Sequence, residues 1–237
     1  IAEVHQDKFQ LLSFPENCPI LFCAFPMIGT NDFNFPIVIH SEKFVPNRER
    51  DGIEISKYDT ANRARLIEAR DAFLRLLKII EEFEWTDAFN ISSLHSPDFN
   101  DSEIKTWFTD SIFEPIKKNL LKTKMVELDD SLDVESKRLS LSEVYIPYAD
   151  RRLKNYTELV NKIYNLAFKT IPTLLPKREH FLHWFEILDF GILTRGKLDL
   201  EELTKVITQD VNSLGKFCSK YSMNEGDAIK YLIEYIK

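Results

Sequence analysis

The period of the apolar residues changes near residue 59, and this change constrains the fold more than any other feature of the sequence. Before it, prolines interrupt short Phe, Ile and Val runs at Pro15, Pro19, Pro26, Pro36 and Pro46. Because proline is costly inside a helix, residues 1–57 are expected to favour strands, most clearly at 19–25 and 35–40. The segment between these two, IGTNDFN, carries the Gly, Asn and Asp that turns select.

After residue 59 the apolar residues recur at a helical period. One face of the expected helix carries Leu66, Ala69, Phe73, Leu76, Leu77 and Ile80. Asp59 or Thr60 can cap its start. A second helix is expected from Asp101 or Ser102, resuming at Pro115 with a kink and running to about Leu121.

In residues 124–147, apolar and polar residues alternate on both sides of an acidic turn, and this pattern predicts a β-hairpin. From residue 150 onward the pattern is nearly all helical, with Pro176 suited to a first helical turn and Asp199 to a helix start. The expected fold is α+β, with a small β-rich N-terminal part packed on a long helix and then a mainly helical region with one hairpin. The expected domains are residues 1–90 and 91–237.

The charge and composition exclude several classes of function. A formal charge of −7 argues against a protein that coats nucleic acid, which needs clustered Lys and Arg. No apolar run approaches the roughly 18–20 residues that span a bilayer, so no membrane association is expected and the setting is expected to be cytoplasmic. Three cysteines without a CxxC indicate neither a disulfide framework nor a zinc cluster. With only 6 Gly, the chain has few positions for a loop that cradles phosphate.

Residues 21–55 join an apolar run, a Pro-rich turn, an alternating strand and an arginine-bearing loop. This order resembles sacsin-type proteins of the gyrase, heat-shock chaperone and histidine-kinase (GHKL) ATPase superfamily, just after their ATP-binding domain. The matching pieces are Leu21–Cys23, Phe25–Met27, Phe35–His40, Phe44 and Asn47–Arg50. Ser140–Val144 resemble part of the hairpin of the same family. The chain has His40-Ser41 where the family has Asn-Gly, and Glu49 splits the paired arginines.

The resemblance implies a non-catalytic region that couples nucleotide state to a client or partner protein. Arg48 and Arg50 would then face the γ-phosphate of ATP bound by the preceding domain, with Asn47 beside the nucleotide. Arginine suits that role because its planar fork can hold two phosphate oxygens. No cofactor is expected in this chain itself, whereas ATP and magnesium are expected for the intact protein. Because the chain opens at Ile1 and ends inside an amphipathic pattern, we expect it to be a piece of a longer polypeptide.

Two other functions stay open. One is a helical module that binds another protein and has no link to ATP, and the other is an enzyme whose pocket gathers Arg48, His95 and His180. His180 and His183 have the spacing of two metal ligands, but no third ligand is indicated nearby, so no metal site is expected. The aromatic residues Phe33, Phe35 and Phe44 could stack on bases or a partner, although core packing explains them better. The basic cluster of Arg151, Arg152 and Lys154 is expected to be a solvated helix face.

Overall fold

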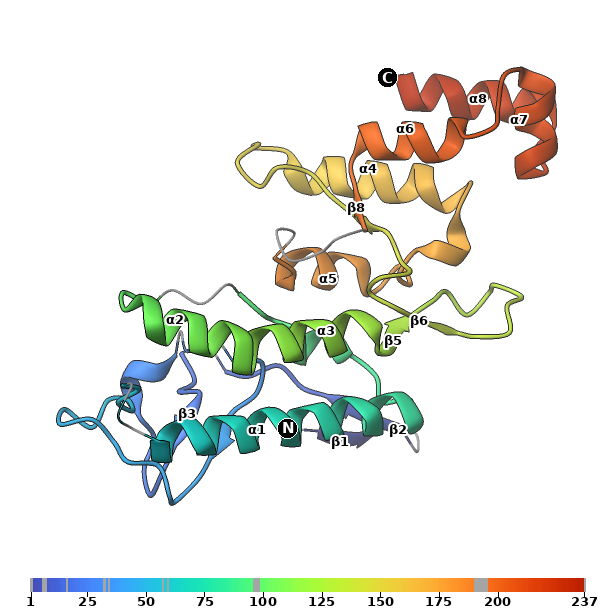
Figure 1. Ribbon diagram of the computed structural model, residues 1–237. Coiled ribbons are helices and arrows are strands. Elements are labelled where there is room, and N and C mark those ends of the chain that lie inside the picture. Colours follow the sequence, from blue (N-terminus) through green and yellow to red (C-terminus); the bar gives the residue numbers. More distant parts are fainter. Residues whose placement is uncertain are drawn as a thin grey trace. The chain divides into compact units, whose positions relative to one another are not determined.

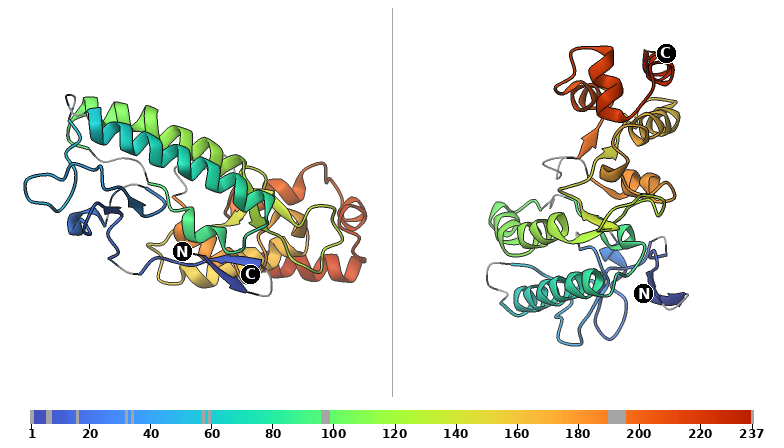
Figure 2. Two further views of the ribbon diagram at one scale, coloured as in Figure 1. Left: turned by 90° about the horizontal axis from the view of Figure 1, so that it is seen from below. Right: turned by 90° about the vertical axis from the view of Figure 1, so that its right-hand side faces the viewer.

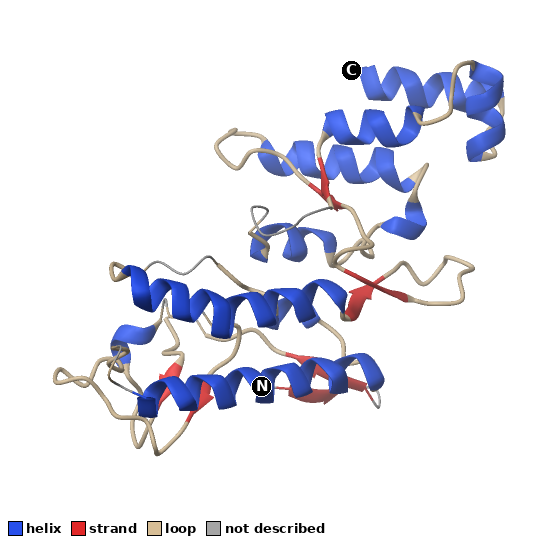
Figure 3. Ribbon diagram, in the orientation of Figure 1, coloured by secondary structure: helices blue, strands red, loops and turns tan. Residues whose placement is uncertain are grey.

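A computed structural model of the chain describes residues 2–5, 8–15, 17–31, 33, 35–56, 58, 60–95, 99–189 and 196–236. It shows a mainly helical α+β fold (Figures 1 and 3). The chain divides into two compact units, the first comprising Ile1–Val126, Ser140–Ser142 and Ile187–Thr194, and the second comprising Glu127–Leu139, Glu143–Glu186 and Arg195–Lys237.

The strands of the first unit are short. An antiparallel pair joins β1 (Ala2–His5) to β2 (Lys8–Leu11). The two clearest expected strands keep only two residues each, β3 (Leu21–Phe22) and β4 (Ile39–His40), and they pair in parallel. A 3₁₀ turn at Ile28–Thr30 occupies the expected turn segment. Thr30 holds this turn to β3, because its hydroxyl donates to the Met27 carbonyl at 2.7 Å and accepts the Leu21 N–H at 3.0 Å.

Helix α1 (Thr60–Glu82) follows the predicted period. Leu66, Phe73, Leu77 and Ile80 are buried on its inner face, and burying each large apolar side chain contributes about 1.5–3 kcal/mol. Ala69 and Leu76 of the expected face are half-buried. The expected cap at Asp59 lies outside the described residues.

A second helical rod runs alongside α1 in both Figure 1 and Figure 2. It comprises α2 (Ser102–Phe108), a π-helical turn (Thr109–Phe113) and α3 (Glu114–Lys122). Asp101 caps α2 as predicted, accepting the N–H groups of Glu103 and Ile104. The π turn lies where the kink was expected. Pro115 cannot donate to the Ser111 carbonyl four residues earlier, and Arg70 Nη1 of α1 donates to that carbonyl instead at 2.6 Å.

The expected hairpin forms, but its second strand is shorter than predicted. Strand β5 (Lys124–Glu127) pairs with β6 (Arg138–Ser140). The prediction that this second strand extends to residue 147 is wrong, because β7 (Ile146–Pro147) pairs in parallel with β8 (Lys197–Leu198). An alternating apolar pattern reports which face is buried but not which strand is the partner.

The second unit is built mainly from helices, namely α4 (Tyr156–Phe168), α5 (Phe181–Ile187), α6 (Leu200–Thr208), α7 (Leu214–Tyr221) and α8 (Glu225–Ile236). Asp199, expected at a helix start, caps α6, and Ser213 caps α7. Pro176 does not open α5, which begins five residues later. Its carbonyl instead accepts the hydroxyl of buried Tyr164 at 3.0 Å.

Aromatic side chains fill the interior of the second unit. Tyr164 stacks on Phe181 with ring centroids 4.0 Å apart, and burial raises the pKa of its phenol. Trp184, Phe185 and Tyr231 are also buried. Within the described part of the chain, no helix combines the length and apolar character needed to cross a membrane.

Candidate functional site

The arginine loop, defined as residues 46–53, is the feature of the first unit that the sequence marked out. An antiparallel bridge between Pro46 and Ile53 closes it. Asn47 organises its interior, because its side-chain nitrogen donates to the Asp51 carboxylate at 2.7 Å and its side-chain oxygen accepts the Gly52 N–H at 3.3 Å. Asn47, expected to lie beside a nucleotide, therefore makes hydrogen bonds that shape the loop.

Asn62 of α1 holds the two ends of the arginine loop. Its side chain is fully buried. The amide nitrogen donates to the carbonyls of Val45 at 2.8 Å and Glu54 at 3.0 Å, and the amide oxygen accepts the Val45 N–H at 2.9 Å. One buried amide thus joins both flanks of the loop to the long helix.

A second contact sets the loop against the 3₁₀ turn. A Cβ atom placed on Gly29 would lie 2.8 Å from the backbone carbonyl oxygen of Asp51, which is closer than real Cβ atoms approach. Only glycine at position 29 permits this approach of the two backbones.

Arg48 and Arg50 are both exposed at the outer end of this loop. Arg50 has a positive φ of 61°, which is uncommon for a residue other than glycine, and its guanidinium carbon lies 6.0 Å from the centroid of the Phe25 ring. The loop therefore presents two guanidinium groups to solvent from a backbone fixed at its base. This arrangement can bind an anion such as a phosphate or a carboxylate.

Both histidines of the expected pair lie in the second unit, and His180 lies beside the Glu127 carboxylate, which also contacts a lysine. His180 Nδ1 is 3.7 Å from one oxygen of Glu127, while Lys177 Nζ is 2.8 Å from the other. Arg138 Nη2 is 4.0 Å from the same carboxylate. The positive charges of Lys177 and Arg138 oppose a metal ion at Glu127.

The arginines of the basic cluster near residue 151 form hydrogen bonds within the second unit. Arg151 donates to the Phe185 carbonyl and to the Glu186 carbonyl at 3.0 Å. Arg152 donates to Asp150, and this hydrogen bond lowers the pKa of the Asp150 carboxyl to about 2. These arginines stabilise the segment before α4.

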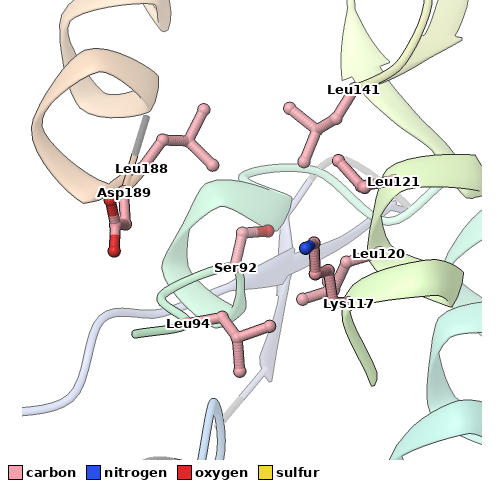
Figure 4. A pocket seen from close by; sticks show the side chains of 8 residues that line it. All are labelled: Ser92, Leu94, Lys117, Leu120, Leu121, Leu141, Leu188 and Asp189. Atoms are coloured by element: carbon pink, nitrogen blue, oxygen red, sulfur yellow. The ribbon is translucent and has the colours of Figure 1, made fainter. Parts of the chain in front are cut away.

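Three cavities in the first unit differ in size and lining. The smallest has a volume of about 20 Å³, room for about one water, and Figure 4 shows the Ser92 hydroxyl and the Lys117 amine among its leucines. The amide cavity, about 370 Å³, is lined by Phe14, Ile20, Asn31, Phe33, Phe35, Pro36, Asn90, Ser93 and His95. The apolar cavity, about 640 Å³, is lined by Leu11, Phe14, Pro15, Cys18, Phe22, Ile37, Val38, Leu76, Trp85 and Ile91.

Of the three residues named for an enzyme pocket, His95 lines the amide cavity, and Arg48 is not among the described residues of that lining. His180 belongs to the second unit. Phe33 and Phe35 line the amide cavity, and both Phe35 and Phe44 are buried in the core.

Sequence reasoning missed two asparagines, Asn62 and Asn31. A signal for Asn62 was present, because it stands four residues before Leu66, on the apolar face of α1, where a polar residue needs hydrogen-bond partners. Asn31 stands in a segment that reads as an ordinary turn.

Comparisons with known proteins give no relative. No family model matches the chain, and neither the curated proteins nor the solved structures contain a significant match to it.

Proposed function

We propose that this chain is a non-catalytic region of a larger, cytoplasmic, sacsin-like ATPase, and that its arginine loop contacts the γ-phosphate of ATP held by another domain of the same polypeptide. ATP and magnesium belong to that domain. The first unit then passes the nucleotide state to a client or partner protein.

The observation that supports this proposal is that two exposed arginines lie on a loop whose two ends are held in place. Arg48 and Arg50 are exposed, while Asn62 anchors both flanks of their loop through three hydrogen bonds. A preorganised guanidinium stabilises charge that develops during phosphoryl transfer without reorganising at the moment of reaction.

The test is ATP hydrolysis by the intact protein, comparing wild type with Arg48→Ala and Arg50→Ala. At least one variant should lower turnover about tenfold or more while nucleotide affinity stays within about twofold, because the contact acts mainly in the transition state. Arg75→Ala is the matched control, since Arg75 is an exposed arginine of α1 outside the loop. Wild-type turnover in both loop variants would show that the arginine loop takes no part in ATP hydrolysis.

A second candidate function is a helical module that binds a partner protein without ATP. It is favoured by Ile229 and Ile233, which lie four residues apart on α8 and are each 46% exposed. An intact protein that neither binds nor hydrolyses ATP would favour this function over the first.

A further inference from the structure

Exposed apolar side chains gather at the C-terminal end of α1, whereas Asn62 holds the arginine loop near the N-terminal end of the same helix. Leu76, Ile79 and Phe83 are three and four residues apart, so they line one side of the helix. The Phe83 N–H donates to the Ile79 carbonyl at 2.9 Å, which continues the helical turn past Glu82. Phe83 is 61% exposed and Ile79 is 39% exposed. Large apolar side chains that gather at a protein surface mark interaction sites.

The residues that follow α1 extend this apolar side onto β2. Phe9 of β2 stacks on Trp85 with ring centroids 4.8 Å apart, and it is 43% exposed. Two backbone hydrogen bonds hold the strand in place, because the Thr86 N–H donates to the Phe9 carbonyl at 2.9 Å and the Leu11 N–H donates to the Thr86 carbonyl at 3.0 Å. The α1 apolar surface is defined as Phe9, Leu76, Ile79, Phe83 and Trp85.

The apolar cavity adjoins the α1 apolar surface. Leu76 and Trp85 belong to the surface and also line the cavity, and among its described lining residues none is charged. Its volume of about 640 Å³ leaves room for apolar side chains of a partner. Filling this space would remove further apolar area from water, which favours binding.

The charges beside this surface are negative. Glu81, Glu82 and Glu84 adjoin Phe83 in the chain and are exposed, and the last turn of α1 holds no basic residue. The C-terminal end of a helix carries a partial negative charge and is stabilised by cations, so glutamates there are unfavourable for the helix alone. Residues that break such a local rule are expected at functional sites. A basic partner would offset both the glutamates and the helix dipole.

This charge distinguishes between apolar ligands. An anionic membrane or a fatty acid has the same sign of charge as the glutamates and would be repelled by them. An amphipathic helix with lysine or arginine on its polar face has the opposite sign, and its apolar face suits a hydrophobic groove.

We infer that the α1 apolar surface and the apolar cavity bind a basic amphipathic helix of a partner protein. Its apolar side chains lie against Phe83 and in the cavity, and its cationic side chains lie beside Glu81 and Glu82. This interaction is independent of the arginine loop and of ATP.

The test measures direct binding of a labelled peptide to the purified chain by fluorescence anisotropy. The probe is an amphipathic peptide of about 18 residues with leucines on one helical face and lysines on the other. It should bind saturably with a Kd below about 100 µM in about 0.05 M salt, and more weakly as salt is added. A comparison peptide with glutamate in place of every lysine should bind at least about tenfold more weakly.

One variant and its matched control test the apolar contact. Phe83→Ser removes an exposed ring and should weaken binding of the lysine peptide about tenfold. Ile229→Ser changes an exposed apolar residue of α8 and should bind the peptide as wild type does. Circular dichroism verifies that each variant is folded.

A second pair of variants tests the charge. Glu81→Lys combined with Glu82→Lys should weaken binding of the lysine peptide about fivefold or more, and lysine at a helix C-terminus favours folding. Asp133→Lys combined with Glu135→Lys makes the same change of net charge in the hairpin loop, where both residues are exposed. This control should change the affinity by less than about twofold, because the hairpin loop is not part of the α1 apolar surface.

Four results would overturn the inference. One is the absence of binding of the lysine peptide at about 0.5 mM. Another is wild-type affinity in folded Phe83→Ser, or lost binding in Ile229→Ser, since the peptide would then lie elsewhere. The third is equal affinity for the lysine and glutamate peptides, because the glutamates would then not select the partner. The fourth is binding of the chain to vesicles of phosphatidylglycerol that Phe83→Ser abolishes, which would assign the surface to a membrane.

Discussion

Two asparagines of the first unit, Asn62 and Asn31, carry the same side chain in opposite situations. Asn62 is buried and its amide makes three hydrogen bonds, to both flanks of the arginine loop. Asn31 is only half-buried, yet its Oδ1 atom is shielded and has no partner among the described residues. Asn62 stabilises a loop, whereas Asn31 carries an acceptor that folding alone leaves unsatisfied.

The difference shows which buried amides contribute to stability. A buried amide whose partners lie inside the protein contributes to the free energy of unfolding, and replacing it leaves backbone groups unpaired. A buried amide oxygen without a partner costs stability instead, because it has lost its hydrogen bonds to water and gained none in return. Substitutions at the two positions should therefore change stability in opposite directions.

The largest expected effect is from Asn62→Leu. This change removes three hydrogen bonds and leaves the carbonyls of Val45 and Glu54 and the N–H of Val45 without their partner. We expect the free energy of unfolding to fall by about 2–4 kcal/mol, measured by urea denaturation, because each unpaired group costs about 1 kcal/mol or more.

The same variant tests whether the proposed function needs the anchored base of the arginine loop. If the proposed function holds, Asn62→Leu should also lower ATP turnover of the intact protein at a temperature where it remains folded, because Arg48 and Arg50 lose their fixed base. A loss of stability below about 0.5 kcal/mol would show that Asn62 does not anchor the loop, and the contrast with Asn31 would disappear.

The next effect concerns the docking of the arginine loop on the 3₁₀ turn. Gly29→Ala would place a Cβ atom 2.8 Å from the Asp51 carbonyl oxygen, and a backbone atom cannot yield as a flexible side chain can. We expect a loss of about 1–3 kcal/mol in the free energy of unfolding.

Gly215→Ala is the matched control for this change. Gly215 lies in α7, and a Cβ atom there meets nothing within 4 Å. Alanine favours a helix over glycine by roughly 0.5–1 kcal/mol, so this variant should be as stable as wild type or more so. Equal effects of the two substitutions would mean that the loop does not press on Gly29.

The sequence predicted the elements that depend on local signals. The period of Leu66, Phe73 and Ile80 located α1, and the acids at positions 101 and 199 located the starts of α2 and α6. Each of these signals acts within a few residues, so the sequence alone contains it.

The sequence did not predict which distant strands pair. Strand β3 lies in an expected strand segment, but β3 and β7 have only two residues each, too few for a period to indicate a partner. Each pairs in parallel with a strand at least 17 residues further along the chain. The arginine loop was recognised as a candidate, but its anchor was not, because Asn62 bonds to residues 8 and 17 positions away. The amide cavity depends on three separate stretches meeting in space, which no local pattern reports.

The smallest expected effect on stability is from Asn31→Leu. The Asn31 side-chain oxygen forms no hydrogen bond with any described residue, so replacing the amide by an apolar group of similar size removes a desolvation cost and breaks no bond to that oxygen. We expect the free energy of unfolding in urea to change by less than about 1 kcal/mol, with any change toward greater stability. Destabilisation by 2 kcal/mol or more would show that the Asn31 side chain stabilises the fold, as the Asn62 side chain is expected to do.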